Sequence, residues 1–314
     1  KRVPQDGRIE MNISGKSYDF RVSTLPTVFG EKVVIRILDR TSFLYTREML
    51  GCTRQNSELV DKIIKRTNGI ILLTGPTGSG KSTTLYSLLR ELNTPEVNIV
   101  TIEDPVEYML HGINQVQVNN KAGLTFAAGL RSILRQDPDI VMIGEIRDEE
   151  TAQIAVRASI TGHLVLSTLH TNDAPSSVAR LIDMGIEPFL VAEALSGVIA
   201  QRLVRRLCPA CKKKDLANQA ELEILGSTEP VEIYRPTGCP KCNSTGFSGR
   251  LAIHEVMHVN RVLRDAIQNG SGTEALRDIA QQNGMVKLYE GCRQLVLDGV
   301  TSISEMVKTV YVRD

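Results

Sequence analysis

The part of the sequence best suited to chemistry is a glycine-rich segment with a lysine and several hydroxyl residues. It consists of Gly75, Pro76, Thr77, Gly78, Ser79, Gly80, Lys81, Ser82 and Thr83. An apolar run precedes it, and the pattern after it predicts a helix from Ser82 to Leu92. Glycines let backbone N–H groups turn toward a phosphate, and the start of a helix adds positive potential. We therefore expect Lys81 to reach the β- and γ-phosphates of a nucleotide and the Ser82 hydroxyl to bind Mg²⁺.

Carboxylates follow two other predicted strands. Glu145 ends an apolar run, as an acidic residue does in a Walker B strand, although Asp is more usual there. Glu103, Asp104 and Glu107 come just after another run. The carboxyl ends of parallel strands gather where a ligand binds, so these acids are expected to hold the metal's outer shell or to orient water. A solvated turn remains the alternative for the acidic cluster, and the general base can be either Glu103 or Glu145.

Two histidines bracket a further strand, His163 before it and His170 after it. His170 follows the strand, where it is placed to sense a γ-phosphate by hydrogen bonding. A purely structural histidine is the competing interpretation.

Four arginines are candidates for phosphate binding. Alternation places Arg36 on the same strand face as Val34, and Arg21 also lies within a predicted strand. Arg131 and Arg135 are one helical turn apart and share a face. Arginine binds phosphate oxygens in a fork, and such residues often come from another domain or subunit. Ordinary ion pairs within the chain are the alternative for each of them.

Two Cys-x-x-Cys pairs predict a metal site: Cys208 with Cys211, and Cys239 with Cys242. Four thiolates at this double spacing form a closed tetrahedral site that suits structural zinc and leaves no open position for catalysis. Free thiols are the weaker alternative.

Composition limits the classes of protein that remain. The chain has 314 residues, 42% of them hydrophobic, so it can bury a large core and divide into domains. A formal net charge of +1 and only 4% aromatic residues make a nucleic-acid partner unlikely on chemical grounds. The longest apolar runs are too short to cross a bilayer, so we expect no transmembrane segment and a cytosolic protein.

Short β-rich runs alternate with helical patterns in the middle of the chain. The predicted strands are 70–74, 98–102, 113–118, 140–144 and 164–168. This alternation indicates an α/β fold with a mostly parallel sheet covered by helices. Residues 1–38 are predicted to be β-structure.

Several motifs occur in one order: GPTGSGKSTTLY, TIEDPVEY, LRSILRQDPDIVMIGEIRD, TGHLVLSTLHTNDA and CPAC…CPKC. Together they closely resemble the secretion ATPase superfamily, and within it the type IV pilus assembly and type II secretion ATPases. The resemblance implies a RecA-like P-loop core and a PAS-like N-terminal α+β domain. It also implies a homo-hexamer that turns ATP and water into ADP and phosphate to drive pilus or pseudopilus assembly.

The resemblance also assigns residues. Lys81 and Ser82 match the Walker A element, Glu103 and its neighbours the Asp box, and Glu145 the Walker B element. His163 and His170 match the His box, and Arg21 and Arg36 match N-terminal arginines that the family directs at nucleotide. The four cysteines favour assembly or secretion, because the related retraction ATPases lack them.

Four regions are expected from this resemblance. They are a partial PAS-like N-terminal domain and linker (1–45), the RecA-like core (46–200), a tetracysteine zinc subdomain (201–250) and a helical C-terminal region (251–314). Family members carry further N-terminal domains that dock on an inner-membrane platform protein, so we expect such segments upstream and a location peripheral to the inner membrane. The rival functions are a DNA-translocating secretion ATPase and a zinc-based module that only senses nucleotide.

Overall fold

The computed structural model describes residues 3–39 and 45–310, and the chain divides into two compact units, Lys1–Tyr45 and Thr46–Asp314. Residues 40–44 of the expected linker lie outside the described residues. The subdivision expected within 46–314 remains a prediction.

The first unit is a three-stranded antiparallel sheet in the order β1-β2-β3, formed by β1 (Gln5–Ile13), β2 (Lys16–Thr27) and β3 (Gly30–Asp39). Strand alternation gives the sheet one apolar face, on which Ile9, Phe20 and Ile37 lie opposite one another. The described residues of this unit contain no helix, and the PAS-like α+β domain stays a prediction.

Arg36 is exposed, although strand alternation puts it on the same face as the apolar Val34. Val34, on the same face of β3, is 54% exposed. The described side chains of β3 are all exposed. The reason is that a sheet buries a face only when a second layer packs on it, and this unit consists of one layer.

The second unit is built on a seven-stranded sheet in the order β12-β9-β4-β8-β7-β5-β6. Its strands are β4 (Gly69–Thr74), β5 (Ile99–Glu103), β6 (Asn114–Gln117), β7 (Ile140–Ile143), β8 (Leu164–Leu169), β9 (Leu195–Leu207) and β12 (Phe247–His258). The strands from β9 to β6 pair in parallel, and only β12 runs antiparallel to its neighbour. The α/β sheet expected from the sequence is therefore confirmed, in a mixed form.

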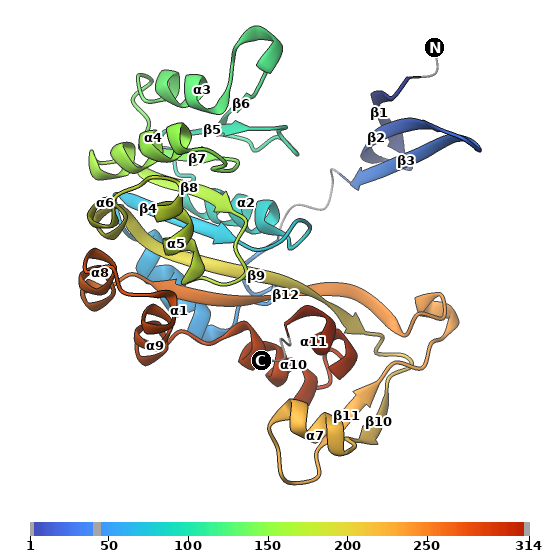
Figure 1. The fold of residues 1–314 in the computed structure, drawn as a ribbon. Coiled ribbons are helices and arrows are strands. Elements are labelled where there is room, and N and C mark those ends of the chain that lie inside the picture. The colour runs from blue at the N-terminus through green and yellow to red at the C-terminus, as the bar shows by residue number, and fades with distance from the viewer. Residues whose placement is uncertain (1–2, 40–44, 311–314) are drawn as a thin grey trace. The chain divides into compact units, whose positions relative to one another are not determined.

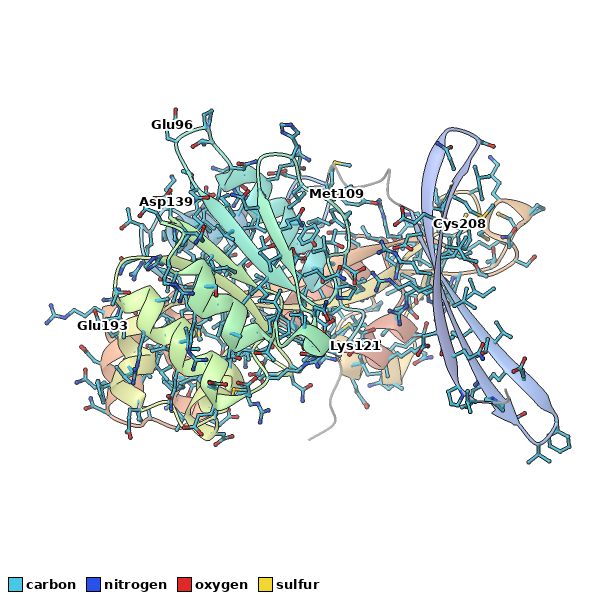
Figure 2. All side chains as sticks on the ribbon, turned by 90° about the horizontal axis from the view of Figure 1, so that it is seen from above. Glu96, Met109, Lys121, Asp139, Glu193 and Cys208 are labelled. Atoms are coloured by element: carbon cyan, nitrogen blue, oxygen red, sulfur yellow. The ribbon has the colours of Figure 1, made fainter. Side chains whose placement is uncertain are left out.

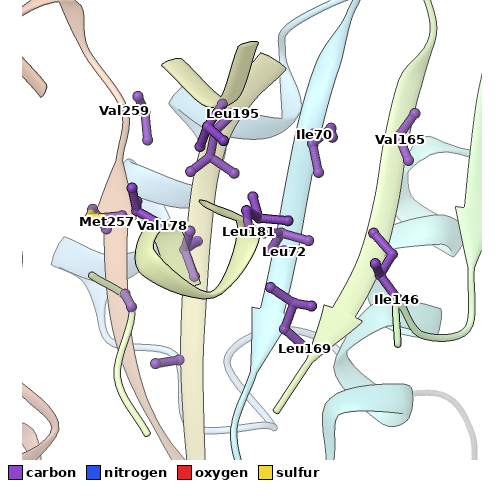
Figure 3. Close-up of a cluster of buried hydrophobic side chains, with 14 of the residues drawn as sticks. Ile70, Leu72, Ile146, Val165, Leu169, Val178, Leu181, Leu195, Met257 and Val259 are labelled. Atoms are coloured by element: carbon purple, nitrogen blue, oxygen red, sulfur yellow. The ribbon is translucent and has the colours of Figure 1, made fainter. Parts of the chain in front are cut away.

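Helices cover both faces of this sheet. On one face Ile71 and Leu73 of β4 pack with α1 (Arg54–Ile64) and α2 (Lys81–Leu92). On the other face Ile70 and Leu72 join a larger core. The helices that contribute to that core are α3 (Phe126–Ile133), α4 (Glu149–Ile160), α5 (Ser176–Asp183), α6 (Pro188–Ala194), α7 (Gln219–Leu225), α8 (Arg261–Gln268), α9 (Thr273–Gln282), α10 (Leu288–Leu297) and α11 (Ile303–Thr309). Figure 3 shows Val178 and Leu181 of α5 beside Leu72 and Leu195 in this core.

The paired strands β9 and β12 run beyond the other strands and carry the cysteine region between them (Figure 1). That region contains β10 (Lys213–Leu216), α7 (Gln219–Leu225), β11 (Glu232–Arg235) and a short 3₁₀ turn at Pro240–Cys242. Another short 3₁₀ turn, at Asn120–Ala122, lies outside it, between β6 and α3. The expected borders at 200 and 250 fall inside β9 and β12, and residues 251–258 are strand and not helix. In the described ranges no helix is long and apolar enough to span a membrane.

Candidate nucleotide-binding site

The glycine-rich segment forms a loop between β4 and α2. Gly75 and Gly80 have φ angles of +142° and +87°, which side chains with a Cβ rarely adopt. Gly80 is the N-cap of α2, whose first turn contains no acidic residue. Backbone N–H groups at the start of such a helix attract an anion, so this loop fits a phosphate.

Lys81 is buried at the base of the loop. Its Nζ donates hydrogen bonds to the carbonyl oxygens of Gly75 (2.7 Å) and Pro76 (3.2 Å). Burial lowers the pKa of Lys81, while the negative charge of Glu145 acts in the opposite direction. Ser82, the next residue, is exposed at the rim. A phosphate oxygen that replaced the two carbonyl acceptors would give the buried ammonium group an anionic partner.

Glu145 follows β7, and its side chain is 14% exposed. Arg147 Nη2 lies 2.5 Å from one carboxylate oxygen, and His170 Nε2 lies 3.7 Å from the other. The hydrogen bond to Glu145 raises the pKa of Arg147, against a smaller effect of burial. The strand tips of β7 and β8 thus bring Glu145 and His170 together and add Arg147, which was not among the residues predicted from the motifs.

Glu103 has a different environment, because all its neighbours are hydrogen-bond donors. The hydroxyl of Tyr86 donates to Oε2, and Oε1 accepts from Thr101 Oγ1 (2.6 Å) and Gln115 Nε2 (3.1 Å). The side chain is buried. Burial, followed by the charge of Glu103, raises the pKa of Tyr86. Since Tyr86 belongs to α2, Glu103 ties β5 to the helix that follows the phosphate loop.

The remaining acidic candidates, Asp104 and Glu107, follow Glu103 in the sequence. Asp104 is exposed, and its charge helps to raise the pKa of Arg147. The backbone N–H of Glu107 donates to the hydroxyl oxygen of Tyr86 at 3.3 Å. Both residues are therefore at the same edge of the sheet as the phosphate loop.

Three other candidates are not brought to the loop within this chain. His163 precedes β8, at the opposite end of the strand from His170, and its Nδ1 lies 3.0 Å from the Ala158 carbonyl oxygen. Arg131 forms an ion pair with Glu150 at 2.6 Å. Arg135 donates to the backbone carbonyl of Arg131 at 2.7 Å, just past the end of α3.

The segment after β8 is hydrogen-bonded to the start of the phosphate loop. Thr171 N–H donates to Thr74 Oγ1 (2.9 Å), and the two hydroxyl oxygens are 2.6 Å apart. Thr171 follows His170 in the sequence, and Thr74 immediately precedes Gly75. These bonds therefore link the position of His170 to that of the loop. The sequence offered no signal for Thr171, because a threonine in a loop has many ordinary roles.

In the first unit, Arg21 and Arg36 lie directly opposite each other on β2 and β3. Arg8 lies opposite Arg21 on β1, so the three residues form one row across the sheet face. Arg8 also pairs with Asp19 (2.8 Å) and Glu10 (3.2 Å). The sequence could have indicated Arg8, because it alternates with the apolar Ile9 as a strand residue does and could have joined the arginine candidates for phosphate binding.

The four cysteines converge at the end of β9 and in the turn before β12. Their sulfur atoms all lie within 4.8 Å of one another, and three pairs are 3.7, 3.8 and 3.9 Å apart. A tetrahedron with Zn–S bonds of about 2.3 Å has edges of about 3.8 Å, so the geometry fits zinc. Cys242 Sγ accepts N–H groups of Cys239 and Gly246, both at 3.2 Å. Burial raises the pKa of Cys242, but these bonds, together with those from the thiols of Cys239 and Cys211, outweigh it and lower the pKa to about 6.

A phosphate loop between a central parallel strand and a helix, with a carboxylate on a nearby strand tip, defines the P-loop nucleotide-binding class. Residues 1–308 match the family model described as "Type II/IV secretion system protein". The chain belongs to this family, which confirms the resemblance noted in its motifs.

Two relatives and one solved structure show which members of this family the chain is similar to. The "Type II secretion system ATPase E" of Vibrio cholerae serotype O1 is 52% identical over 310 residues, which cover 98% of this chain and 61% of that protein. The "Type II secretion system protein E" of Pectobacterium carotovorum subsp. carotovorum is 51% identical over 308 residues, or 98% and 62% of the two chains. This chain therefore spans about three fifths of the length of these relatives. The pilus retraction motor PilT with bound ADP is 26% identical, with a TM-score of 0.70 over 98% of this chain and 77% of that chain.

Proposed function

We propose that this chain binds ATP in the loop between β4 and α2 and hydrolyses it to ADP and phosphate. The observation that carries the proposal is the meeting of three groups at one sheet edge. Lys81 lies in the loop, Glu145 influences its charge state, and His170 stands 3.7 Å from Glu145. Family membership and the name of the V. cholerae relative support the same activity.

The residues divide the work as follows. Lys81 exchanges its two carbonyl acceptors for phosphate oxygens, and the N–H groups at the start of α2 hold the same phosphates. Glu145 orients the attacking water and accepts its proton. Mg²⁺, when bound, neutralises phosphate charge, and the exposed Ser82 hydroxyl is the ligand that this loop offers it. Arg21 and Arg36 are proposed to bind phosphate oxygens of a nucleotide, as the resemblance to the family implies.

We assign the general base to Glu145 because its surroundings differ from those of Glu103. Both oxygens of Glu103 are occupied by neutral donors that hold β5 on α2. Glu145, whose side chain is 14% exposed, has Arg147 at 2.5 Å from one oxygen, while His170 lies 3.7 Å from the other oxygen, beyond hydrogen-bond distance. Glu103 then acts by positioning the P-loop helix.

The test compares two variants of equal size. Glu145→Gln is expected to lower the ATP turnover rate by about 100-fold or more, with nucleotide affinity changed only a few-fold. Glu103→Gln is expected to lower turnover by less than about 10-fold, because an amide oxygen still accepts from Tyr86. Lys81→Ala is the reference for a disabled loop. Full turnover in Glu145→Gln together with loss in Glu103→Gln would reverse the assignment, and equal turnover in all three would refute hydrolysis at this site.

We propose that the full-length protein uses this activity in type II secretion or in type IV pilus assembly. The names of the relatives at 51–52% identity support the first of these settings. As in the family that the motifs resemble, the protein would act as a homo-hexamer on an inner-membrane platform protein, at the cytoplasmic side. Sedimentation of the chain with and without a non-hydrolysable ATP analogue tests whether a hexamer forms.

We also propose that the four cysteines bind one structural zinc ion. The support is the sulfur spacing described above and the makeup of the group, which among the described residues consists of these four cysteines without a His, Asp or Glu. A site with four protein ligands has no open position, so zinc would stabilise the fold and take no part in hydrolysis.

A further inference from the structure

A glutamine of β9, the strand beside β4, contacts the phosphate loop. Gln201 lies in β9, which pairs in parallel with β4, and its side chain is 1% exposed. Its Nε2 donates to the carbonyl oxygen of Ser79 at 2.7 Å, and its Oε1 accepts from Thr84 Oγ1 at 2.7 Å. One buried amide therefore joins the loop to the first turn of α2.

The orientation of this amide follows from its partners. The Ser79 carbonyl oxygen can only accept a hydrogen bond, so the NH₂ group of Gln201 must face it. The hydroxyl of Thr84 is then left to donate to Oε1, which satisfies the other half of the amide. A buried amide with both ends bonded is stable, and loss of either bond leaves a buried polar group unpaired.

The bond to Ser79 has a geometric effect on the next residue. In a planar trans peptide the carbonyl of one residue and the N–H of the following residue point in opposite directions. Gln201 holds the Ser79 carbonyl on its own side, so the N–H of Gly80 points away from β9 and toward the inside of the loop. That N–H is one of the groups which a P-loop offers to phosphate.

The two glycines of the loop are fitted to this same residue. A Cβ on Gly80 would lie 2.9 Å from Gln201 Nε2, and a Cβ on Gly75 would lie 2.3 Å from the backbone oxygen of Gln201. Both ends of the loop therefore rest on one position of β9. We propose that Gln201 is a positioning residue for nucleotide binding, which acts by fixing the direction of the Gly80 N–H through the Ser79 carbonyl.

The inference rests on the proposed ATP site, and its test keeps the two separate. Gln201→Met has similar length and makes neither hydrogen bond. It is expected to raise the dissociation constant for ADP and the KM for ATP by about tenfold. Thr84→Val is the matched control, because it removes the bond to Oε1 and leaves the bond to Ser79 in place. Its ADP affinity is expected to stay within about threefold of the wild type.

A second variant gives a readout that general loss of packing would not produce. In Gln201→Glu only the protonated acid can donate to the Ser79 carbonyl. Its ADP affinity should therefore recover as the pH is lowered, by about tenfold relative to the wild type measured at the same pH values. Fluorescent ADP titrations, with circular dichroism to show that each variant is folded, provide the measurement.

The outcomes separate the two proposals. Wild-type protein that binds no ADP, like Lys81→Ala, would refute the proposed function. Wild-type protein that binds ADP, with a folded Gln201→Met variant of equal affinity or a Gln201→Glu variant without recovery at low pH, would overturn the role of Gln201 alone.

Discussion

A single buried residue, His254, sets a pH limit on the fold. It lies in β12, and among the described residues its Nδ1 has no hydrogen-bond partner. Burial lowers the pKa of His254 to about 4. Arg47 and Cys52 line the same small cavity. Burial raises the pKa of Cys52, and Arg47 is charged throughout, so neither changes charge in mildly acidic solution.

This predicts a loss of stability in weak acid. The folded-state pKa is below the unfolded value of about 6.5, so the unfolded chain takes up the proton first and stability falls as the pH drops from about 6.5 to 4. The loss from this residue reaches on the order of 3 kcal/mol at pH 4. Urea unfolding at several pH values, for the wild type and His254→Leu, measures it. Parallel pH curves for the two proteins would contradict the prediction.

Individual site residues were predictable where their partners are close in the sequence. Lys81 and the loop glycines were found because one motif contains them all. Gln201, Thr171 and Arg147 were not, because their roles depend on which strands become neighbours in the sheet. A buried glutamine or a loop threonine carries no signal until its hydrogen-bond partner is known.

At the scale of elements, the five strands β4 to β8 were predicted to within about one residue, for example 70–74 against Gly69–Thr74. Except for β6, whose residues are exposed or half-buried, each is a short apolar run that is buried on both faces of the sheet, and such runs are distinctive. The long strands β9 and β12 were missed. Their ends leave the sheet, and there exposed arginines such as Arg205 and Arg206 interrupt the apolar pattern.

The segment before α1 is attached to the P-loop helix by Arg47. Its Nη2 lies 2.7 Å from Asp61 on α1 and 2.9 Å from Glu91 on α2. The arginine side chain is 15% exposed, whereas that of Arg54, which pairs with Glu58 on the surface, is 94% exposed.

We expect Arg47→Ala to lower the free energy of unfolding by about 1–2 kcal/mol, because it leaves two carboxylates without their shared cation. Arg54→Ala is the control and is expected to change it by less than about 0.5 kcal/mol. Urea titrations of both variants measure the difference. Equal effects would show that Arg47 is no more than a surface ion pair.

At the scale of the whole molecule, the cysteine cluster and the nucleotide site are separate parts joined by β9. Figure 2 shows Cys208 and Glu193 far apart, just beyond the two ends of that strand. Because the cluster is closed, its metal should affect folding more than chemistry.

We therefore expect about one zinc ion per chain by elemental analysis of protein purified without chelator. Cys242→Ser should lower the melting temperature by several degrees while the ATP turnover of the remaining folded protein changes less than about threefold. Cys292→Ser is the control, because Cys292 lies in α10 and outside the cluster. Zinc-free wild-type protein of unchanged melting temperature would contradict the prediction.

The place of β9 between β12 and β4 also affects how the protein is made. Ile63 of α1 lies against Gly197 of β9 and shares a buried cluster with Val256 of β12, and the Leu50 carbonyl accepts a hydrogen bond from the Ala252 N–H, so the segments around α1 depend on partners much later in the sequence. On the ribosome β4 and α2 can cover α1 early, but the part of α1 that faces β9 and β12 stays uncovered until those strands have emerged, and contacts of such long range slow folding. The nascent chain therefore exposes this apolar part of α1 until β9 and β12 have been synthesised, and a chaperone can bind it during that time.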